Sequence, residues 1–386
     1  MNNNIENITR QYELTVLLPT LNEQDSLDKI LTEIKLILDK TKINYCILVS
    51  DNGSIDKTLE ICKAHKVIIN NVEIKGYGAN LINAFKKIRS EFLIFFDSDG
   101  SYDPKEILNL FNEIKKNTTI DMVSGNRLKI QEKNAMPFLN KYIGTPILTF
   151  FIRFLYGLKI YDCNSGMRIL RLSSFKNINF FCKGMEFASE IFIKSKLNNI
   201  KIKEIIINFR KDFRSKEPHL SRWRDGWRHL RYIIANSPDR AIIFLISIVF
   251  LNYMLIIILS FLSAESNLPR YHTIFSLLAI NQFFQSLFLG ILSMRINLVL
   301  VENFKSNLVS KIFYLKENNT FMKIFIFFLI LLFLELIFLL FRWYKLSFGL
   351  LSEIETMIRI LIYSALGSFF IYLDLQIESR ISNEKF

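Results

Sequence analysis

A run of five apolar residues, Phe92–Phe96, leads directly into Asp97, Ser98 and Asp99. A strand made only of Phe, Leu and Ile is typical of a parallel sheet that is covered on both faces. Ligands of such sheets bind just beyond the carboxyl ends of the strands. Two carboxylates one residue apart repel each other there and suit a hard divalent cation. The alternative is an ordinary polar turn, since Asp, Ser and Gly100 are all common turn residues.

The same arrangement recurs earlier in the chain. Leu14–Leu18 is predicted to form a short apolar strand that ends in a polar turn, and Tyr45–Val49 is predicted to form another. Residues 25–39, between them, place apolar side chains at helical spacing. Strands that alternate with helices predict an α/β domain with a mostly parallel sheet, whose polar strand ends converge along one edge.

These strand ends carry groups suited to a nucleotide diphosphate. Glu23, Asp51 and Asn52 can exchange hydrogen bonds with a base and a ribose, while Gly76 and Gly78 let backbone N–H groups approach a ligand closely at a helix start. Each feature alone has an ordinary alternative, because Gly-x-Gly and Asp-Asn-Gly-Ser are also common loop sequences. The informative feature is the ordered set.

The last part of the chain has a different composition. Four long apolar stretches occur at residues 241–262, 273–294, 324–341 and 358–377. The first has 22 residues, and as a helix it would be about 33 Å long, enough to cross the hydrocarbon core of a bilayer. We therefore predict a soluble domain over residues 1–220 and a helical transmembrane domain of about four helices over residues 240–386. A soluble helical domain with a large core is the alternative.

The net charge of +13 is unevenly placed. Lysine and arginine outnumber aspartate and glutamate by 38 to 27 before residue 241 and by 11 to 9 after it. A basic segment just before the first apolar stretch favours anionic lipid at the cytoplasmic surface. The loop at 295–323 carries five basic residues, so the positive-inside rule predicts a multi-pass plasma-membrane protein with a cytoplasmic first domain and cytoplasmic termini. Nucleic-acid binding would explain the basicity but not the four apolar stretches.

A helix is predicted over residues 221–239, between the two domains. Trp223, Trp227, Leu230 and Ile234 recur at helical spacing, with arginines between them. A helix of this kind is expected to lie in the membrane interface, with its Trp and Leu side chains directed toward the lipid.

The strand-end motifs, taken in order, resemble a known family. They are Pro19–Glu23, Asp51–Asp56, Lys75–Ala79, Asp97–Asp99, Gly125–Arg127 and Asp162–Arg168. Together with the segment that begins at Arg210, they are similar to the inverting family 2 glycosyltransferases with the GT-A fold, and among these to the polyprenyl-phosphate sugar synthases. The resemblance covers about residues 12–235, so it implies a GT-A catalytic domain ahead of the apolar stretches.

The resemblance implies a role for each matching residue. Donor binding is implied for Pro19, Leu21, Glu23, Ser50, Asp51, Asn52, Gly76, Asp97 and Ser98. A metal ion, Mg²⁺ or Mn²⁺, is implied to bind Asp97, Asp99 and Ser101. Ser101 stands where related enzymes often have a metal-contacting Gln, which leaves the third protein ligand open. Catalytic roles are implied for Asp99, Arg127, Arg210 and Lys216, and contacts with the acceptor phosphate for Arg127, Lys141 and Arg168.

The implied reaction moves a single sugar from a UDP- or GDP-sugar to a polyprenyl phosphate, with inversion at the anomeric carbon. A phosphate oxygen is already an anionic nucleophile, so the reaction needs no strong general base. The expected partners are therefore a nucleotide sugar, a polyprenyl phosphate and the membrane, not nucleic acid, and the apolar stretches are compatible with a homo-oligomer. The sequence does not identify the sugar, the base or the polyprenol.

Two other functions are compatible with the sequence. A processive polysaccharide synthase also joins a GT-A domain to membrane helices, but those enzymes typically carry a Gln-x-x-Arg-Trp segment, and His219 stands at the Gln position ahead of Arg222 and Trp223. A non-catalytic membrane scaffold that binds a nucleotide sugar is the second alternative, and the intact acidic and glycine motifs disfavour it.

Overall fold

The computed structural model describes residues 2–213 and 222–236, together with the isolated positions 251, 323, 326, 327, 330, 334, 337 and 341. The chain divides into two compact units, Met1–Ile233 and Ile234–Phe386. The predicted spans at 273–294 and 358–377 lie outside the described residues, and those at 241–262 and 324–341 are described only at isolated positions. Among the described residues, none of the helices has both the length and the apolar character needed to cross a bilayer.

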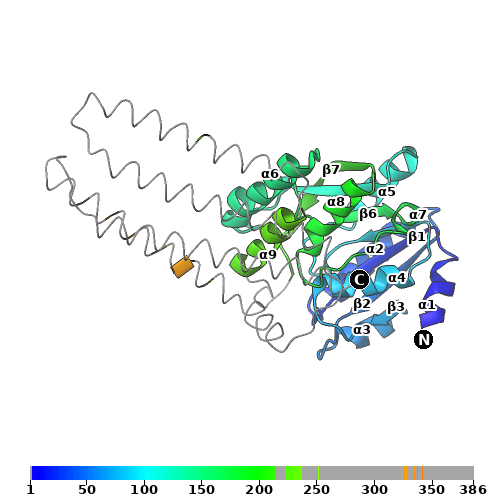
Figure 1. Ribbon diagram of the computed structural model, residues 1–386. Coiled ribbons are helices and arrows are strands. Elements are labelled where there is room, and N and C mark those ends of the chain that lie inside the picture. Colours follow the sequence, from blue (N-terminus) through cyan, green and yellow to red (C-terminus); the bar gives the residue numbers. More distant parts are fainter. Residues whose placement is uncertain are drawn as a thin grey trace, which may run out of the picture. The chain divides into compact units, whose positions relative to one another are not determined.

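A seven-stranded sheet runs through the described part of the first unit. Its strands are β1 (Leu14–Thr20), β2 (Tyr45–Asp51), β3 (Ile68–Asn71), β4 (Phe92–Phe95), β5 (Met122–Gln131), β6 (Arg168–Arg171) and β7 (Ile202–Phe209), in the order β3-β2-β1-β4-β6-β5-β7. β6 runs antiparallel to β4 and β5, and the other neighbouring pairs are parallel. The predicted α/β class with a mostly parallel sheet is therefore confirmed (Figure 1).

Helices connect these strands and flank the sheet (Figure 1). In the described residues they are α1 (Asn2–Thr9), α2 (Leu27–Leu38), α3 (Thr58–Ala64), α4 (Tyr77–Lys87), α5 (Glu106–Lys116), the π-helical turn η1 (Asn140–Gly144), α6 (Thr145–Tyr156), α7 (Leu172–Phe175), α8 (Phe187–Leu197) and α9 (Arg222–Ala235).

The core fixes where the strand ends lie. Five apolar residues of α2, from Leu27 to Leu38, recur at helical spacing and are fully buried in one cluster with β1 and β4. All residues of Phe92–Phe96 are also buried, as expected for a strand covered on both faces. β1 and β2 each extend two residues beyond the predicted strands, to Thr20 and Asp51. As a result, β1, β2 and β4 end at the same edge of the sheet.

The predicted helix before the apolar stretches is present as α9, and its described face packs against the first unit. His229, Tyr232 and Ile233 are buried. The Tyr156 hydroxyl of α6 donates a hydrogen bond of 2.7 Å to the Ile233 carbonyl, and the Ser189 hydroxyl of α8 lies 2.7 Å from His229 Nδ1. α9 is therefore anchored to α6 and α8, and an interfacial position for its remaining side chains stays a prediction.

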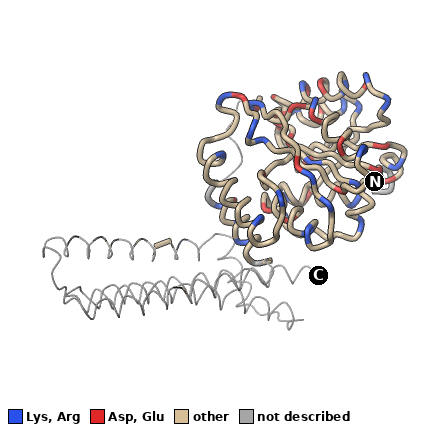
Figure 2. The backbone as a smooth tube through the Cα atoms, turned by 90° about the horizontal axis from the view of Figure 1, so that it is seen from above, with Lys and Arg blue, Asp and Glu red and all other residues tan. Residues whose placement is uncertain are grey.

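Lysine and arginine alternate with aspartate and glutamate over the described domain (Figure 2). A protein that binds nucleic acid through its backbone phosphates gathers its basic residues on one face or along one groove. Charges of both signs lie over the described domain in this view, and the expectation that nucleic acid is not a partner stays a prediction.

Candidate functional site

Hydrogen bonds join the carboxyl ends of three strands. The Ser98 hydroxyl, just after β4, donates to the Pro19 carbonyl of β1 at 2.9 Å, and the Asn52 N–H, just after β2, donates to the Thr20 carbonyl at 3.0 Å. The Ser26 hydroxyl, next to the start of α2, donates to the Ser98 carbonyl at 2.7 Å. The polar strand ends thus converge along one edge, as the sequence predicted.

The loop Asp97–Ser101 has its own internal geometry. Asp99 Oδ1 accepts hydrogen bonds from the Ser101 N–H at 3.0 Å and from the Ser101 hydroxyl at 2.6 Å. Gly100 has a φ of +88°, the left-handed region that favours glycine. Ser101, which was predicted to bind a metal, therefore orients the carboxylate of Asp99, and its role as a metal ligand stays a prediction.

The segment after β7 lies along this loop. The Arg210 N–H donates to the Ser101 carbonyl at 2.8 Å, and the Phe213 N–H donates to the Asp99 carbonyl, also at 2.8 Å. The Phe213 ring lies so close to Gly100 that a Cβ atom at Gly100 would overlap it. The sequence predicted that residues from Arg210 onward contact the donor, and the contacts place residues 210–213 directly on the acidic loop.

Arg210 has carboxylate and carbonyl partners around it. Its Nη2 donates to Glu33 Oε2 on α2 at 2.9 Å and to the Tyr102 carbonyl at 3.2 Å, and it lies 3.8 Å from Asp103 Oδ1. These contacts hold the guanidinium beside the acidic loop. Lys216, the other catalytic residue predicted in this segment, lies outside the described residues.

Two predicted donor residues at the end of β2 have structural hydrogen bonds. Asp51 Oδ2 accepts from the N–H groups of Gly53 and Ser54, at 2.9 and 3.0 Å. Asn52 Nδ2 donates to the carbonyls of Val72 and Ile74 at 3.0 and 2.8 Å, and Asn52 Oδ1 accepts from the Gly76 N–H at 2.8 Å. Both residues therefore shape the loops around the site. The Asp51 bonds form the local turn that its loop sequence also allowed, whereas the Asn52 bonds were missed because their partners lie 20 to 24 residues away.

The glycines at the start of α4 serve close packing. The Gly78 N–H donates to the Gly184 carbonyl at 3.2 Å, and a Cβ atom at Gly76 would overlap the Lys183 carbonyl. The expectation that the N–H groups of Gly76 and Gly78 face a ligand is not met here, because both donate within the protein. The segment 182–184 passes so close to the start of α4 that no residue with a side chain fits at position 76 or 78.

The other predicted donor residues surround the same edge. Pro19 is buried in β1, Leu21 is half-buried and Glu23 is buried. The Glu23 N–H donates to the Thr58 hydroxyl at 2.9 Å, and Glu23 Oε2 accepts from the Ser26 hydroxyl at 3.1 Å. The Ser50 hydroxyl accepts from Asn70 Nδ2 at 2.9 Å.

Arg127 forms a bidentate ion pair that the sequence interpretation missed. Its Nε and Nη2 donate to the two carboxylate oxygens of Asp162, at 2.8 and 2.9 Å, and Asp162 is fully buried. Burial acts to lower the pKa of Arg127, but Asp162 and Tyr102 outweigh it and raise this pKa above its ordinary value. Asp162 also accepts a hydrogen bond within its own loop, from the Asn164 N–H at 3.2 Å.

Arg168 is a buried cation with spare donors. Only 1% of its surface is exposed, its Nη2 donates to the Cys163 carbonyl at 2.9 Å, and its Cζ lies 4.2 Å from the centre of the Phe192 ring. In the described part of the chain, Nε and Nη1 have no hydrogen-bond partner. Burial lowers the pKa of Arg168 to about 10, which is still high enough to keep the side chain charged near neutral pH. The third predicted acceptor residue, Lys141, lies on η1.

Two tyrosines next to Asp97 were not predicted. Tyr77 opens α4, and burial followed by the nearby Asp97 carboxylate, to which it hydrogen-bonds, raises the pKa of its phenol well above the usual value. Tyr102 is buried, and its hydroxyl accepts from the Gly166 N–H at 2.5 Å. These phenols contribute polar groups on the side of Asp97 that faces Arg127 and Arg168. No local pattern could have revealed them, because aromatic residues usually indicate core.

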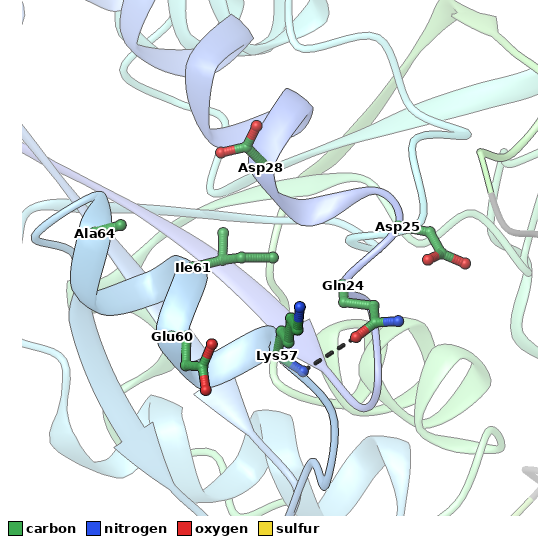
Figure 3. A pocket seen from close by; sticks show the side chains of 7 residues that line it. All are labelled: Gln24, Asp25, Asp28, Lys57, Glu60, Ile61 and Ala64. Carbon is green, nitrogen blue, oxygen red and sulfur yellow. Dashed lines mark hydrogen bonds between the residues drawn. The ribbon is translucent and has the colours of Figure 1, made fainter.

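A separate pocket lies between the start of α2 and α3 (Figure 3). Its lining consists of Gln24, Asp25, Asp28, Lys57, Glu60, Ile61 and Ala64. Three carboxylates against a single lysine would repel a diphosphate, and none of the predicted site residues belongs to this lining. The strand-end edge is therefore the better candidate for an anionic ligand.

Comparisons with known proteins identify the domain. Residues 15–178 match Glycosyl transferase family 2. The chain is 32% identical over 226 residues to the low-salt glycan biosynthesis hexosyltransferase Agl6 of Haloferax volcanii, covering 58% of this chain and 54% of that protein. It is also 31% identical over 215 residues to an uncharacterized protein of Methanocaldococcus jannaschii, covering 53% of this chain and 84% of that protein.

A dolichyl-phosphate hexose transferase of Haloferax volcanii is 27% identical over 198 residues, with 51% of this chain and 83% of that protein covered. Among solved structures, glucosyl-3-phosphoglycerate synthase from Mycobacterium tuberculosis in complex with Mn²⁺, uridine diphosphate and glucosyl-3-phosphoglycerate has a TM-score of 0.46 at 17% identity, covering 61% of this chain and 82% of that chain. The chain spans about half the length of the Agl6 protein. On the family match and the 31% identity over most of the Methanocaldococcus protein, this chain belongs to glycosyl transferase family 2.

Proposed function

We propose that this chain transfers a single sugar from a UDP- or GDP-sugar to a polyprenyl phosphate at the cytoplasmic surface of the membrane, with inversion at the anomeric carbon. The observation that carries the proposal is the junction at Asp97–Ser101. The end of β1, Ser26 next to α2 and the segment 210–213 all hydrogen-bond to this acidic loop, through its backbone carbonyls and the Ser98 hydroxyl, and the end of β2 hydrogen-bonds to the end of β1 beside it. Four distant segments thus meet around the loop that carries Asp97 and Asp99.

The donor nucleotide would lie along this edge. Pro19, Leu21, Glu23 and the loop held by Asp51 and Asn52 would contact its base and ribose. Arg210 would face its diphosphate, for which a forked guanidinium is suited. The interpretation is supported by the family match over residues 15–178.

Mg²⁺ or Mn²⁺ would bind at Asp97 and Asp99. The donor set fits, since both ions prefer oxygen ligands and Ser101 holds Asp99 in a defined orientation. In the described residues, no group of three or more His, Cys, Asp or Glu side chains is arranged around one point. Oxygens of the donor diphosphate and water would therefore complete the shell. The ion would neutralise charge on the departing nucleoside diphosphate.

The acceptor side would use the basic residues on β5, β6 and η1. Arg168 has two guanidinium nitrogens without partners among the described residues, so it can gain hydrogen bonds from an incoming phosphate. Arg127 is already paired with the Asp162 carboxylate, so it would provide a positive charge at a fixed position near the acceptor phosphate. Lys141 would be a further cation there. A polyprenyl phosphate is supported by the similarity to a dolichyl-phosphate hexose transferase.

The membrane setting rests on the apolar stretches after residue 240. Anionic lipid would attract the basic residues ahead of the first stretch, and the loop charges favour a cytoplasmic catalytic domain. An acceptor with a long isoprenoid chain is available only in a bilayer, which agrees with this placement.

The test is a transfer assay with the full chain in lipid. Purified protein, undecaprenyl phosphate, Mg²⁺ or Mn²⁺ and a panel of UDP- and GDP-sugars should yield an acid-labile lipid with one added sugar, identified by mass spectrometry. Asp99→Asn should lower the rate by about 100-fold or more, since it removes charge from the ion site. Asp28→Asn, a change of the same chemistry at a carboxylate on α2, is the control and should retain the wild-type rate.

Other outcomes would contradict the proposal. Full activity in Asp99→Asn would remove the metal assignment. A long polymer in place of a single-sugar lipid would favour the processive synthase, and tight donor binding without turnover on any acceptor would favour the non-catalytic scaffold.

A further inference from the structure

The largest cluster of exposed apolar side chains among the described residues lies on η1 and α6. Its members, here called the α6 face, are Phe138, Leu139, Tyr142, Ile143, Ile147, Phe150 and Phe154. Each is between 39% and 69% exposed. Leu139, Ile143, Ile147, Phe150 and Phe154 follow one another at intervals of three or four residues, so they form one stripe along the helix, and Phe138 and Tyr142 are four residues apart beside it.

Aromatic contacts make the α6 face continuous. The rings of Phe150 and Phe154 stack with centroids 5.9 Å apart, and the rings of Phe138 and Tyr142 are 4.8 Å apart. Soluble proteins rarely leave an apolar surface of this extent in water, and such surfaces mark contacts with a partner or a membrane.

The charges around the α6 face favour a lipid partner. Residues 133–161 contain Lys133, Lys141, Arg153 and Lys159 and no aspartate or glutamate. Anionic headgroups attract such a segment, whereas a second copy of it would be repelled. Tyr142 among these cations also suits the headgroup boundary, because its ring is apolar and its hydroxyl is polar.

The opposite side of α6 connects the helix to the candidate site. The Thr149 hydroxyl accepts from the Cys163 N–H at 3.2 Å, and the Thr145 hydroxyl accepts from Asn164 Nδ2 at 3.3 Å. Cys163 and Asn164 directly follow Asp162, the partner of Arg127. The side of α6 opposite the α6 face is therefore hydrogen-bonded to the loop that carries Asp162.

We infer that the α6 face docks into the interfacial region of an anionic lipid bilayer and sets the depth at which Arg127 and Arg168 meet a lipid phosphate. This assignment rests on the proposed membrane setting of the chain but not on its transfer activity. η1 and α6 together have 17 residues, which make about 25 Å of helix. Because one side of this helix is apolar and the other makes polar contacts with the protein, we expect it to lie parallel to the membrane surface.

Spin labels measure this docking directly. The full chain carrying Cys182→Ser to remove the half-buried free cysteine is labelled at Phe150→Cys and reconstituted in nanodiscs that contain phosphatidylglycerol. Leu197→Cys is the matched control, because Leu197 at the end of α8 and Phe150 are both 58% exposed apolar residues. Power saturation then compares collisions with oxygen, which concentrates in lipid, and with a water-soluble nickel chelate.

The label at Phe150 should collide with oxygen and be protected from the nickel chelate, and the label at Leu197 should show the reverse. Nickel access at Phe150 equal to that at Leu197 would overturn the assignment. Protection of Phe150 from both reagents would also overturn it, since it would identify protein as the occupant, either another part of this chain or a second copy.

An activity measurement separates the inference from the proposed function. Phe150→Asp should raise the KM for undecaprenyl phosphate in bilayers at least about tenfold, because a charge on the apolar side opposes insertion. It should leave the KM for a short, water-soluble prenyl phosphate unchanged. Equal effects on both acceptors would overturn the docking role, whereas no transfer by the wild type with either acceptor would contradict the proposed function and leave the spin-label result standing on its own.

Discussion

The pairing of Arg127 with Asp162 is the strongest residue-level interaction next to the site. Asp162→Asn would leave the Arg127 guanidinium buried without a balancing charge, which destabilises proteins by about 3–5 kcal/mol. Adding Arg127→Gln removes the stranded charge, so the double variant should recover part of this loss. Thermal melting of the full chain in lipid compares the variants, and strictly additive losses would show that the two side chains do not interact.

His229 makes the stability of the first unit depend on pH. Burial, followed by the nearby Arg168, lowers the pKa of His229 from 6.5 to about 4. Below pH 6.5 the unfolded chain binds a proton that the folded chain does not, so stability is present at neutral pH and is lost as the pH falls toward 4. At about pH 5 the loss should be roughly 2 kcal/mol.

The control for this prediction is His229→Asn. Its amide can keep the hydrogen bond to the Ser189 hydroxyl and does not titrate. The melting temperature of the wild type should fall further than that of the variant between about pH 7 and about pH 5. Parallel curves would mean that His229 already titrates normally in the folded protein.

For single residues, the sequence identifies those whose role is indicated by their immediate neighbours in the chain. Asp97 and Asp99 stand out because a buried strand ends directly in front of them. Asp162 lies 35 residues from Arg127, and nothing near either residue indicates the other. Asn52 was likewise predicted to bind the donor, but its side-chain amide holds the 72–76 segment in place through hydrogen bonds.

Among the elements, the contact of the 210–213 segment with the acidic loop depends on Gly100. Gly100 and Gly53 both have a φ of +88°, so Gly→Ala should introduce about 1 kcal/mol of backbone strain at either position. A Cβ at Gly100 would additionally overlap the Phe213 ring, whereas at Gly53 it would meet only the flexible end of Lys75. Gly100→Ala should therefore destabilise the protein more than Gly53→Ala.

Hydrogen exchange followed by mass spectrometry locates this effect. In Gly100→Ala, the N–H groups of Arg210 and Phe213 should exchange faster, because their acceptors are the carbonyls of Ser101 and Asp99. Gly53→Ala should leave exchange at residues 210–213 unchanged. Equal exchange there in both variants would mean that the Phe213 ring does not hold the segment on the loop.

Elements with a strong local period were predictable. The helical spacing of α2 and the apolar runs of β1, β2 and β4 led to the correct elements, with ends off by two residues at β1 and β2. The antiparallel position of β6 between β4 and β5 was not predictable, because β6 pairs with residues more than 70 positions away in β4 and more than 40 positions away in β5. Helical spacing identifies the apolar side of a helix but not what covers that side. Only the structure therefore distinguishes the buried face of α9 from the exposed α6 face.

For the whole molecule, composition and topology supply different parts of the account. The α/β domain explains the convergence of motifs, and the family match covers the same residues. The membrane domain predicted over residues 240–386 rests on hydropathy and loop charge. We propose that a cytoplasmic transferase held at a bilayer joins these two parts of the account, with the α6 face as its proposed contact surface.

The nucleotide that is released during transfer tests the central claim most directly. Transfer of a sugar alone to a polyprenyl phosphate leaves a nucleoside diphosphate, whereas transfer of a sugar phosphate leaves a nucleoside monophosphate. With the full chain, metal ion and undecaprenyl phosphate, ion-exchange chromatography should detect one UDP or GDP for each single-sugar lipid formed. Release of UMP or GMP, or the absence of any lipid-linked sugar with every donor, would contradict the account.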